Sequence, residues 1–238
     1  MTIVKGKDFW GPSTWYSIHI LTNFYTPSKR VYWINFMESL SHLLPCMECR
    51  LHLQSNLKQY KMTNYLNRKI DLFMWTYVLH DMVNKQISSN PYSSSKKTIK
   101  VSIQYETAKT KYKIRDINNV VDIINFGVNW GNHIWRMIHS IAMTYTPENR
   151  SHFEVFLKSL TNLLPETGGW RHNFSATLNK YPPTKHLTDN KSLFFWTYFI
   201  HNVINKDYAK KRIIKYEDVE NIYDRALKDD CEKCSVTK

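Results

Sequence analysis

The segment LFMWTYVLHDMVNK, Leu72 to Lys85, is apolar on nearly every side of a helix. It returns later in the chain as LFFWTYFIHNVINK, Leu193 to Lys206. A helix that is apolar nearly all round is typical of the buried interior of a helical bundle. His80 lies one helical turn before Asn84, so both side chains face the same neighbour. The segment and its copy therefore predict two helical bundles.

The repeat extends over most of the chain at an offset of 120 to 121 residues. The motif Trp-Gly-x-x-x-Trp-x-x-Ile-His begins at Trp10 and again at Trp130. FMESLSHLLP, which ends at Pro45, returns as FLKSLTNLLP, which ends at Pro165. Periodicity predicts further helices in each copy. In the first copy, one helix is expected to have its first turn at Pro12, a second to span about Tyr32–Leu43, and a third to begin directly after Pro45. A short further helix is expected around Tyr105–Tyr112, and its counterpart in the second copy around Tyr216–Tyr223. The sequence predicts an all-α protein of two tandem domains, joined near residues 115–128.

Composition excludes several classes of protein. A hydrophobic content of 42% is enough for a buried core, and six Gly and eight Pro in 238 residues argue against an all-β design. No apolar run reaches the roughly 18 residues that cross a bilayer. The first residues hold no apolar stretch that could serve as a secretion signal. We expect a cytoplasmic protein with no membrane partner.

The net charge of +13 raises the question of nucleic-acid binding. Seven basic residues fall between Lys96 and Arg115, around the middle of the chain. Such a cluster is more typical of a solvated connecting segment than of a nucleic-acid footprint. We therefore expect no nucleic-acid partner.

All four cysteines occur in two Cys-x-x-Cys pairs, Cys46 with Cys49 and Cys231 with Cys234. The first pair opens a helix after Pro45, where backbone N–H groups and the helix dipole stabilise a thiolate, the nucleophile of disulfide exchange. The second pair lies in a polar C-terminal tail, where the property it can offer is mobility.

Two other readings of the cysteines compete with redox chemistry. They could close one tetrahedral zinc site in a basic module that binds nucleic acid. However, 181 residues separate Cys49 from Cys231, and the first pair follows an apolar helix pair rather than a zinc-ribbon turn. Alternatively, both copies could form an inactive scaffold, which the pairwise grouping of the cysteines disfavours. The spacing favours redox chemistry and no metal.

Taken in order, the motifs resemble the Erv/Alr family of FAD-linked sulfhydryl oxidases, and its small viral members look most similar. The resemblance covers residues 8–85 and rests on Trp-Gly-x-x-x-Trp-x-x-x-His from Trp10, Cys-x-x-Cys-x-x-His from Cys46 and Trp-x-x-x-x-His-x-x-Val-Asn from Trp75. Members are helical bundles that hold FAD noncovalently, oxidise protein thiols and pass the electrons to oxygen, giving hydrogen peroxide. The resemblance implies this activity here, with client protein thiols as partners and, for a viral protein, the host cytoplasm or virion as the location.

The resemblance also implies roles for individual residues. Cys49 would be the thiolate next to the flavin, Cys46 the cysteine that a substrate thiol attacks, and Cys231 with Cys234 the shuttle pair. The residues implied in FAD binding are Trp10, Gly11, Trp15, His19, Tyr25, Cys49, His52, Trp75, His80, Asp81, Val83, Asn84 and Lys97. Asp81 departs from the family, which has Asn there, and the segment Lys85–Ser95 is longer than its counterpart Lys206–Ala209.

The second copy departs further from the family. Glu166 and Gly169 stand where the two cysteines should recur, so this copy cannot exchange a disulfide. We expect Trp170, directly after the lost thiol position, to fill part of the vacated space. The copy keeps other motif residues, which we interpret as relics of a flavin pocket: Trp130, Trp135, His139, Tyr145, His172, His201, Asn202 and Asn205.

Ordinary members of the family are dimers in which the shuttle pair of one subunit serves the other. Duplication would build that dimer inside one chain, as an internal pseudo-dimer. We therefore expect an active FAD-binding domain at residues 1–114, a degenerate domain at 115–228 and a tail with the shuttle pair at 229–238. The resemblance also allows a homo-oligomer beyond this internal pair.

Overall fold

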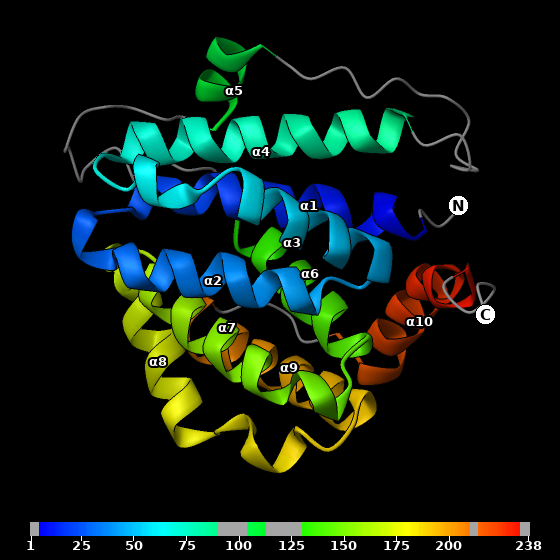
Figure 1. Ribbon diagram of the computed structural model, residues 1–238. Coiled ribbons are helices and arrows are strands. Elements are labelled where there is room, and N and C mark those ends of the chain that lie inside the picture. Colours follow the sequence, from blue (N-terminus) through cyan, green and yellow to red (C-terminus); the bar gives the residue numbers. More distant parts are fainter. Residues whose placement is uncertain (1–4, 90–103, 113–129, 210–213, 234–238) are drawn as a thin grey trace.

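The computed structural model describes residues 5–89, 104–112, 130–209 and 214–233, in which all regular secondary structure is helical. The first copy contains α1 (Lys7–Leu21), α2 (Arg30–Leu43), α3 (Met47–Gln59), α4 (Lys69–Ser89) and α5 (Tyr105–Lys111). The second contains α6 (Trp130–Met143), α7 (Arg150–Leu163), α8 (Trp170–Lys180), α9 (Asn190–Ile204) and α10 (Tyr216–Lys233). Figure 1 shows the first copy as the upper half and the second as the lower half of the molecule. The all-α class with two tandem helical domains is confirmed. The expected junction near residues 115–128 lies outside the described ranges.

Prolines set the ends of α2 and α7. Leu44 and Leu164 are extended, with ψ angles of 142° and 152°, and each precedes a proline. The proline ring disfavours a helical conformation in the residue before it, so both helices end at the same place in the repeat. The turn that follows α2 leads directly into the helix that carries the first cysteine pair.

The prediction that Pro12 lies in the first turn of a helix was wrong. Helix α1 begins at Lys7, and Pro12 lies inside it. The position of Pro12 removes the backbone donor that would bond to Asp8, which the helix tolerates. Gly6, directly before α1, has a φ of 58°, which is not helical, and its backbone N–H donates to the carbonyl of Ala226 in α10 at 2.7 Å.

The two copies pack through α1 against α6 and α2 against α7. Two contacts join residues at equivalent positions of the repeat. The Ser13 hydroxyl lies 3.1 Å from Nδ1 of His133, and the rings of Phe36 and Phe156 stack with centroids 5.6 Å apart. In a two-fold arrangement, only residues on the axis can touch their own equivalents. The chain is therefore an internal pseudo-dimer, as predicted.

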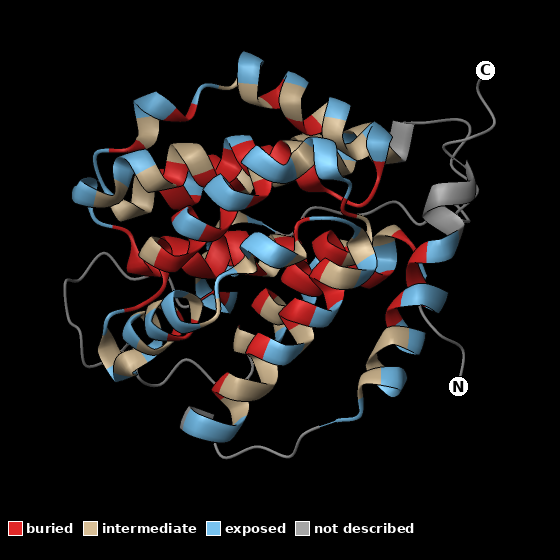
Figure 2. Ribbon diagram, turned by 90° about the horizontal axis from the view of Figure 1, so that it is seen from below, coloured by how far each residue is buried: buried red, intermediate tan, exposed pale blue. Residues whose placement is uncertain are grey.

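Helix α10 belongs to the second copy but crosses onto the first. The ring of Tyr223 meets Phe9 of α1 edge to face at 5.2 Å, and Arg136 lies over the same Phe9 ring at 5.1 Å. One hydrophobic cluster consequently includes residues of both copies. Figure 2 shows this burial, with the buried residues concentrated where the helices face one another.

The expectation that Leu72–Lys85 is buried nearly all round was too strong. The first turns bury Leu72, Phe73 and Trp75 completely, but Met74 is 36% exposed and Phe195 on α9 is 47% exposed. Helix α4 packs against α1, α3 and α5, which leaves one side of it uncovered. None of the helices in the described ranges combines the length and apolar character needed to cross a membrane.

Candidate active site

The first cysteine pair lies at the start of α3, as predicted. Cys46 is the N-cap residue, and its sulfur accepts the backbone N–H of Cys49 at 3.2 Å. Cys46 is only 5% exposed, whereas Cys49 is half-buried. Unpaired N–H groups and the positive end of the dipole at a helix N-terminus favour a thiolate over a thiol. The local geometry therefore suits thiol–disulfide exchange.

Two polar contacts hold the start of α3 in place. Arg50 donates from Nε to the carbonyl of Leu44 at 2.5 Å, which braces the turn between α2 and α3. Glu48, between the two cysteines, lies 3.8 Å from the ammonium group of Lys7. This second contact brings the N-terminus of α1 beside the cysteine pair.

A buried cluster of rings joins α1 to α4. Nδ1 of His19 lies 3.0 Å from the Thr76 hydroxyl, and Nε2 of His19 lies 3.1 Å from Nδ1 of His80. The indole of Trp15 stacks on the His80 ring with centroids 4.1 Å apart and an angle of 6° between the planes. The structure thus brings together three of the residues implied in FAD binding, Trp15, His19 and His80.

The direction of these hydrogen bonds follows from one further contact. The Thr76 hydroxyl donates its hydrogen to the carbonyl of Phe73 at 2.8 Å, so it accepts from Nδ1 of His19. Burial lowers the pKa of His19 well below its ordinary value, and the nearby His80 and Lys111 act in the same direction. A neutral His19 that donates from Nδ1 accepts at Nε2, so His80 donates to it from Nδ1. The chain of donors runs from His80 through His19 and Thr76 to Phe73.

The second copy repeats this cluster with nearly the same geometry. His139 lies 2.8 Å from the Thr197 hydroxyl and 3.0 Å from Nδ1 of His201. Trp135 stacks on His201 at 4.2 Å with an angle of 10°. Burial, and after it His201, lowers the pKa of His139 well below its ordinary value. Loss of the cysteines has therefore left the ring cluster intact.

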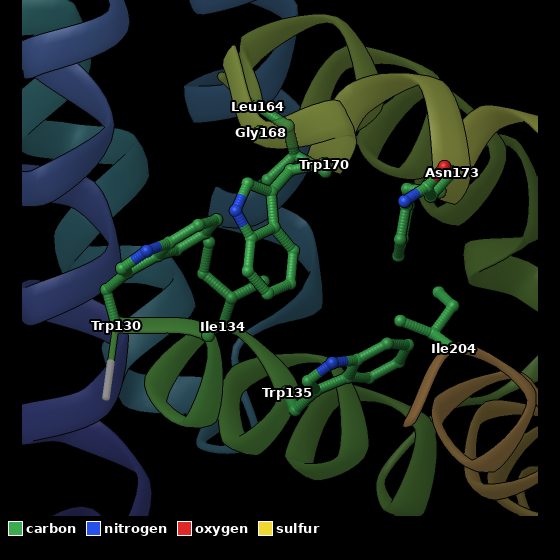
Figure 3. Close-up of a pocket in the computed structure, with 10 residues that line it drawn as sticks. Trp130, Ile134, Trp135, Leu164, Gly168, Trp170, Asn173 and Ile204 are labelled. Carbon is green, nitrogen blue, oxygen red and sulfur yellow. The ribbon is translucent and has the colours of Figure 1, made fainter. Parts of the chain in front are cut away.

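A pocket of about 70 Å³ opens beside the cluster of the second copy (Figure 3). It is lined by Trp130, Gly131, Ile134, Trp135, Leu164, Gly168, Trp170, Asn173, Phe174 and Ile204. Six of these stand at the repeat positions of residues implied in FAD binding, namely Trp10, Gly11, Trp15, Cys49, His52 and Val83. The pseudo-symmetry thus indicates the place of the corresponding site in the first copy, between α1, the start of α3 and α4.

The structure corrects the predicted alignment of the second copy with the first at the position of Cys49. Trp75 donates to the carbonyl of Tyr60 at 3.0 Å, and Trp196 donates to that of Tyr181 at the same distance. Both pairs differ by 121 residues, so the counterpart of Cys49 is Trp170 rather than Gly169. The same count makes Asn173, and not His172, the counterpart of His52.

The extra residue is taken up in the turn before α8. Gly168 and Gly169 have φ angles of 70° and 73°, in the left-handed region that glycine adopts without strain. A short 3₁₀ turn, Thr167–Gly169, stands where the first copy begins its cysteine helix. Around this turn, residues separated by 120 positions in the sequence therefore do not occupy equivalent positions in the two copies.

Other residues implied in FAD binding have different surroundings. The Tyr25 hydroxyl donates to the carbonyl of Leu66 at 2.7 Å, and Trp75 is wholly buried in its bond to Tyr60. Asp81, the departure from the family pattern, forms an ion pair at 2.7 Å with Lys85 one turn later. This pair offsets the charge that the departure adds. Trp10 is buried, and His52, Val83 and Asn84 are half-buried on α3 and α4.

Thr76 and Tyr112 contact the cluster but were not among the predicted site residues. Thr76 orients His19, and the ring of Tyr112 lies 4.6 Å from His19. The available signal was their recurrence, since Thr197 and Tyr223 occupy matching places in the second copy.

Part of the predicted site lies outside the described structure. Lys97 and Cys234 fall outside the described residues, and for Cys231 only the backbone is described. That backbone continues α10 to Lys233, so the second cysteine pair begins as a helical extension of the second copy and not in an irregular tail. Within the described ranges, no three His, Cys, Asp or Glu side chains are grouped to hold a metal ion.

The geometry and the motifs agree with comparisons to known proteins. The model of the Erv1/Alr family matches residues 12–112 and again residues 132–225. The chain therefore belongs to the Erv1/Alr family, with two copies of the family's domain.

Individual relatives are viral, as the resemblance implied. The chain is 36% identical over 98 residues to a probable FAD-linked sulfhydryl oxidase of Acanthamoeba polyphaga mimivirus, covering 39% of this chain and 68% of the relative. It is 36% identical over 94 residues to the FAD-linked sulfhydryl oxidase of a Malawi tick isolate of African swine fever virus, covering 36% of this chain and 74% of the relative. A Kenyan pig isolate gives 34% identity over the same length. No solved structure matches the chain significantly.

Proposed function

We propose that this protein is an FAD-dependent thiol oxidase that generates disulfide bonds in client proteins and passes the electrons to oxygen, giving hydrogen peroxide. The observation that carries the proposal is the placement of Cys46 and Cys49 at a helix N-terminus in the copy that also holds the Trp15–His19–His80 cluster. The names of the viral relatives, FAD-linked sulfhydryl oxidases, support the same activity.

The residues of the first copy fit a flavin. The pocket of the second copy is lined by indole and aliphatic side chains, which suit the faces of a planar ring. In the first copy, the smaller side chain of Cys49 stands in the place of Trp170. His52, His80 and Asn84 supply polar groups near the same space. Bound there, FAD would supply a two-electron acceptor for the dithiol.

The protein's own part of the reaction is an exchange of disulfides. A client thiolate attacks Sγ of Cys46 in the Cys46–Cys49 disulfide, and Cys49 leaves as a thiolate. A second client thiolate then attacks the client sulfur of the mixed disulfide and releases Cys46 as a thiolate. The client is oxidised by two electrons, and the cysteine pair is reduced by two. The helix N-terminus stabilises the thiolate that leaves in the first step.

A relay is needed because Cys46 is only 5% exposed, which prevents a folded client from reaching its sulfur directly. Helix α10 meets the N-terminal end of α1, where the Tyr223 ring contacts Phe9 and the Ala226 carbonyl accepts the N–H of Gly6. Lys7, next to Gly6, contacts Glu48 between the two cysteines. Cys231 follows Ala226 by five residues, about 7.5 Å along a helix. We infer that Cys231 and Cys234 serve Cys46 within one chain.

The second copy has a separate, non-catalytic role in this proposal. Residues 1–114 form the active domain, residues 115–228 the degenerate domain, and residues 229–238 carry the shuttle pair. The degenerate domain supplies the partner surface and the helix that directs the relay. We expect one FAD per chain, no metal, no nucleic-acid or membrane partner, and a cytoplasmic location. A homo-oligomer of whole chains is compatible with this arrangement.

The test is the purified protein with a small dithiol such as dithiothreitol. We expect a yellow protein with a flavin spectrum, uptake of oxygen, and one hydrogen peroxide for each dithiol oxidised. A colourless protein that holds stoichiometric zinc and consumes no oxygen after incubation with FAD would overturn the proposal.

A further inference from the structure

The pocket of the second copy retains part of the lining of the proposed flavin site. Its ring cluster matches that of the first copy in every distance given above, with differences of at most 0.2 Å. Trp130, Gly131 and Trp135 repeat Trp10, Gly11 and Trp15 without change. The ring cluster and these three residues therefore give the second copy part of the framework expected to hold a flavin ring.

Trp170 is the largest change in this framework. It stands at the position of Cys49, so a bicyclic indole replaces a small thiol. Its ring meets the ring of Trp130 at 5.1 Å and an angle of 68°, and Figure 3 shows it projecting into the space beside Trp130 and Trp135. By the repeat register, the equivalent place in the first copy lies next to the sulfur of Cys49.

The backbone of the turn holds the indole in this place. A Cβ on Gly168 would lie 3.3 Å from Cδ1 and Nε1 of Trp170, so the indole packs closely over the glycine. Gly168 also has a φ of 70°, which a residue with a side chain rarely adopts. The inserted residue and the two glycines together position Trp170. Its side chain fills the part of the pocket where the first copy has Cys49.

We propose that the second copy retains a binding site for the isoalloxazine ring of a flavin, and that the side chain of Trp170 prevents a flavin from occupying it. Trp170 is thus the residue that limits the chain to one flavin. This inference rests on the proposed function, because it takes the first copy as the site that is filled. Replacement of Trp170 by Ala opens the second site, because Trp130, Gly131 and Trp135 remain as in the first copy and the ring cluster beside them is intact.

The experiment compares flavin content after incubation with FAD and gel filtration. Trp170 is 40% exposed at the first residue of α8, so its truncation leaves the core in place. We expect one flavin per chain in the parent and two in Trp170→Ala. The matched control is Arg171→Ala, the next residue, which does not line the pocket and should stay at one. A Trp170→Ala protein that stays at one, or an Arg171→Ala protein that also reaches two, would overturn the inference.

The converse experiment is made in the first copy. Cys49→Trp should lose its flavin, whereas Cys49→Ser, which keeps a small side chain, should retain it. A Cys49→Trp protein that still binds one flavin contradicts the role given to the indole. A parent protein without any flavin contradicts the proposed function instead, so the two failures are distinguishable.

Discussion

At the scale of residues, the hydrogen bonds of Thr76 and Thr197 decide how the buried histidines are oriented. Each hydroxyl donates to a carbonyl in its own helix and accepts from a histidine in the neighbouring helix. A buried polar atom without a partner is costly, so each threonine is needed wherever the histidine is buried. The same interaction occurs in the copy that has the cysteine pair and in the copy that lacks it.

Replacement of Thr76 by Val removes the hydroxyl at nearly constant volume and leaves Nδ1 of His19 without its acceptor. We expect a loss of about 1–3 kcal/mol in the free energy of unfolding, the usual effect of an unsatisfied buried group. Thr197→Val is the matched control and should lose a similar amount. Only Thr76→Val should weaken FAD retention, measured as the FAD released on dilution. Equal FAD release from both variants would refute the assignment of the site to the first copy.

Replacement of Cys49 by Ser tests the redox pair directly. The variant should lose oxidation of both a small dithiol and a protein thiol, because no disulfide can form with Cys46. It should keep its flavin, because the aromatic and histidine contacts remain. The measurements are oxygen uptake and the visible absorption spectrum. Undiminished dithiol oxidation would show that the redox centre lies elsewhere.

At the scale of elements, α3 and α8 show how one insertion changed a site. Both helices end at the same place in the repeat, at Gln59 and Lys180. Their starts differ, because the two glycines before α8 replace the first turn that carries Cys46 and Cys49. Helix α10 shows the opposite kind of change, because it is longer than its counterpart α5 in the first copy. Neither change disturbs the ring clusters that the two copies share.

The extension of α10 leads to a prediction about the relay. Cys231→Ser combined with Cys234→Ser should leave oxidation of a small dithiol nearly intact, because such a molecule can reach Cys46 itself. Oxidation of a reduced, folded protein should fall sharply, as measured by loss of free thiols. If both substrates are oxidised at the parent rate, the second pair is not a relay.

A trapping experiment then locates the relay. In a protein with Cys49→Ser and Cys234→Ser, Cys231 should form a mixed disulfide with Cys46 within one chain. Non-reducing electrophoresis distinguishes a cross-linked monomer from a dimer. A disulfide between two chains would contradict the assignment to a single chain.

At the scale of the whole molecule, the axis between the copies makes one core of two domains. Phe36 stacks on Phe156 at the axis, and His42 stacks on His152 with centroids 3.9 Å apart. Burial lowers the pKa of His42, and the adjacent His152 acts in the same direction. Charged rings in these places would oppose the packing that joins the copies.

Several histidines therefore link stability to pH. Burial is the leading cause of the lowered pKa of His19, His42, His133 and His139. An unfolded histidine has a pKa of about 6.5, so below that pH the unfolded chain binds more protons than the folded one. Stability should fall as the pH decreases from about 7.5 to about 5, where most carboxyl groups are still ionised.

Urea denaturation midpoints measured across this range check the prediction. The His139→Gln variant should be less stable at neutral pH but should show a shallower decline with acid, because one linked proton is removed. A midpoint that stays constant, or rises, between about pH 7.5 and 5 would contradict the linkage.

The sequence alone determined the features that depend on local chemistry. The apolar helices, the repeat, the ends of α2 and α7 before Pro45 and Pro165, and the cysteine pair at a helix start all follow from neighbouring residues. Proline geometry and helical periodicity act within a few residues, so they can be recognised without knowledge of the fold. The family motifs likewise indicated Trp15, His19 and His80, which lie together in the cluster.

Only the tertiary structure decided the features that depend on distant contacts. The N-terminal end of α1 is joined to α10 because Gly6 bonds to Ala226, more than 200 residues away in the chain. Trp170 takes the place of Cys49 because two glycines absorb an inserted residue, and Thr76 belongs to the cluster because its hydroxyl meets His19 across two helices. Such contacts are determined by how packed helices meet, which spacing along the chain does not encode.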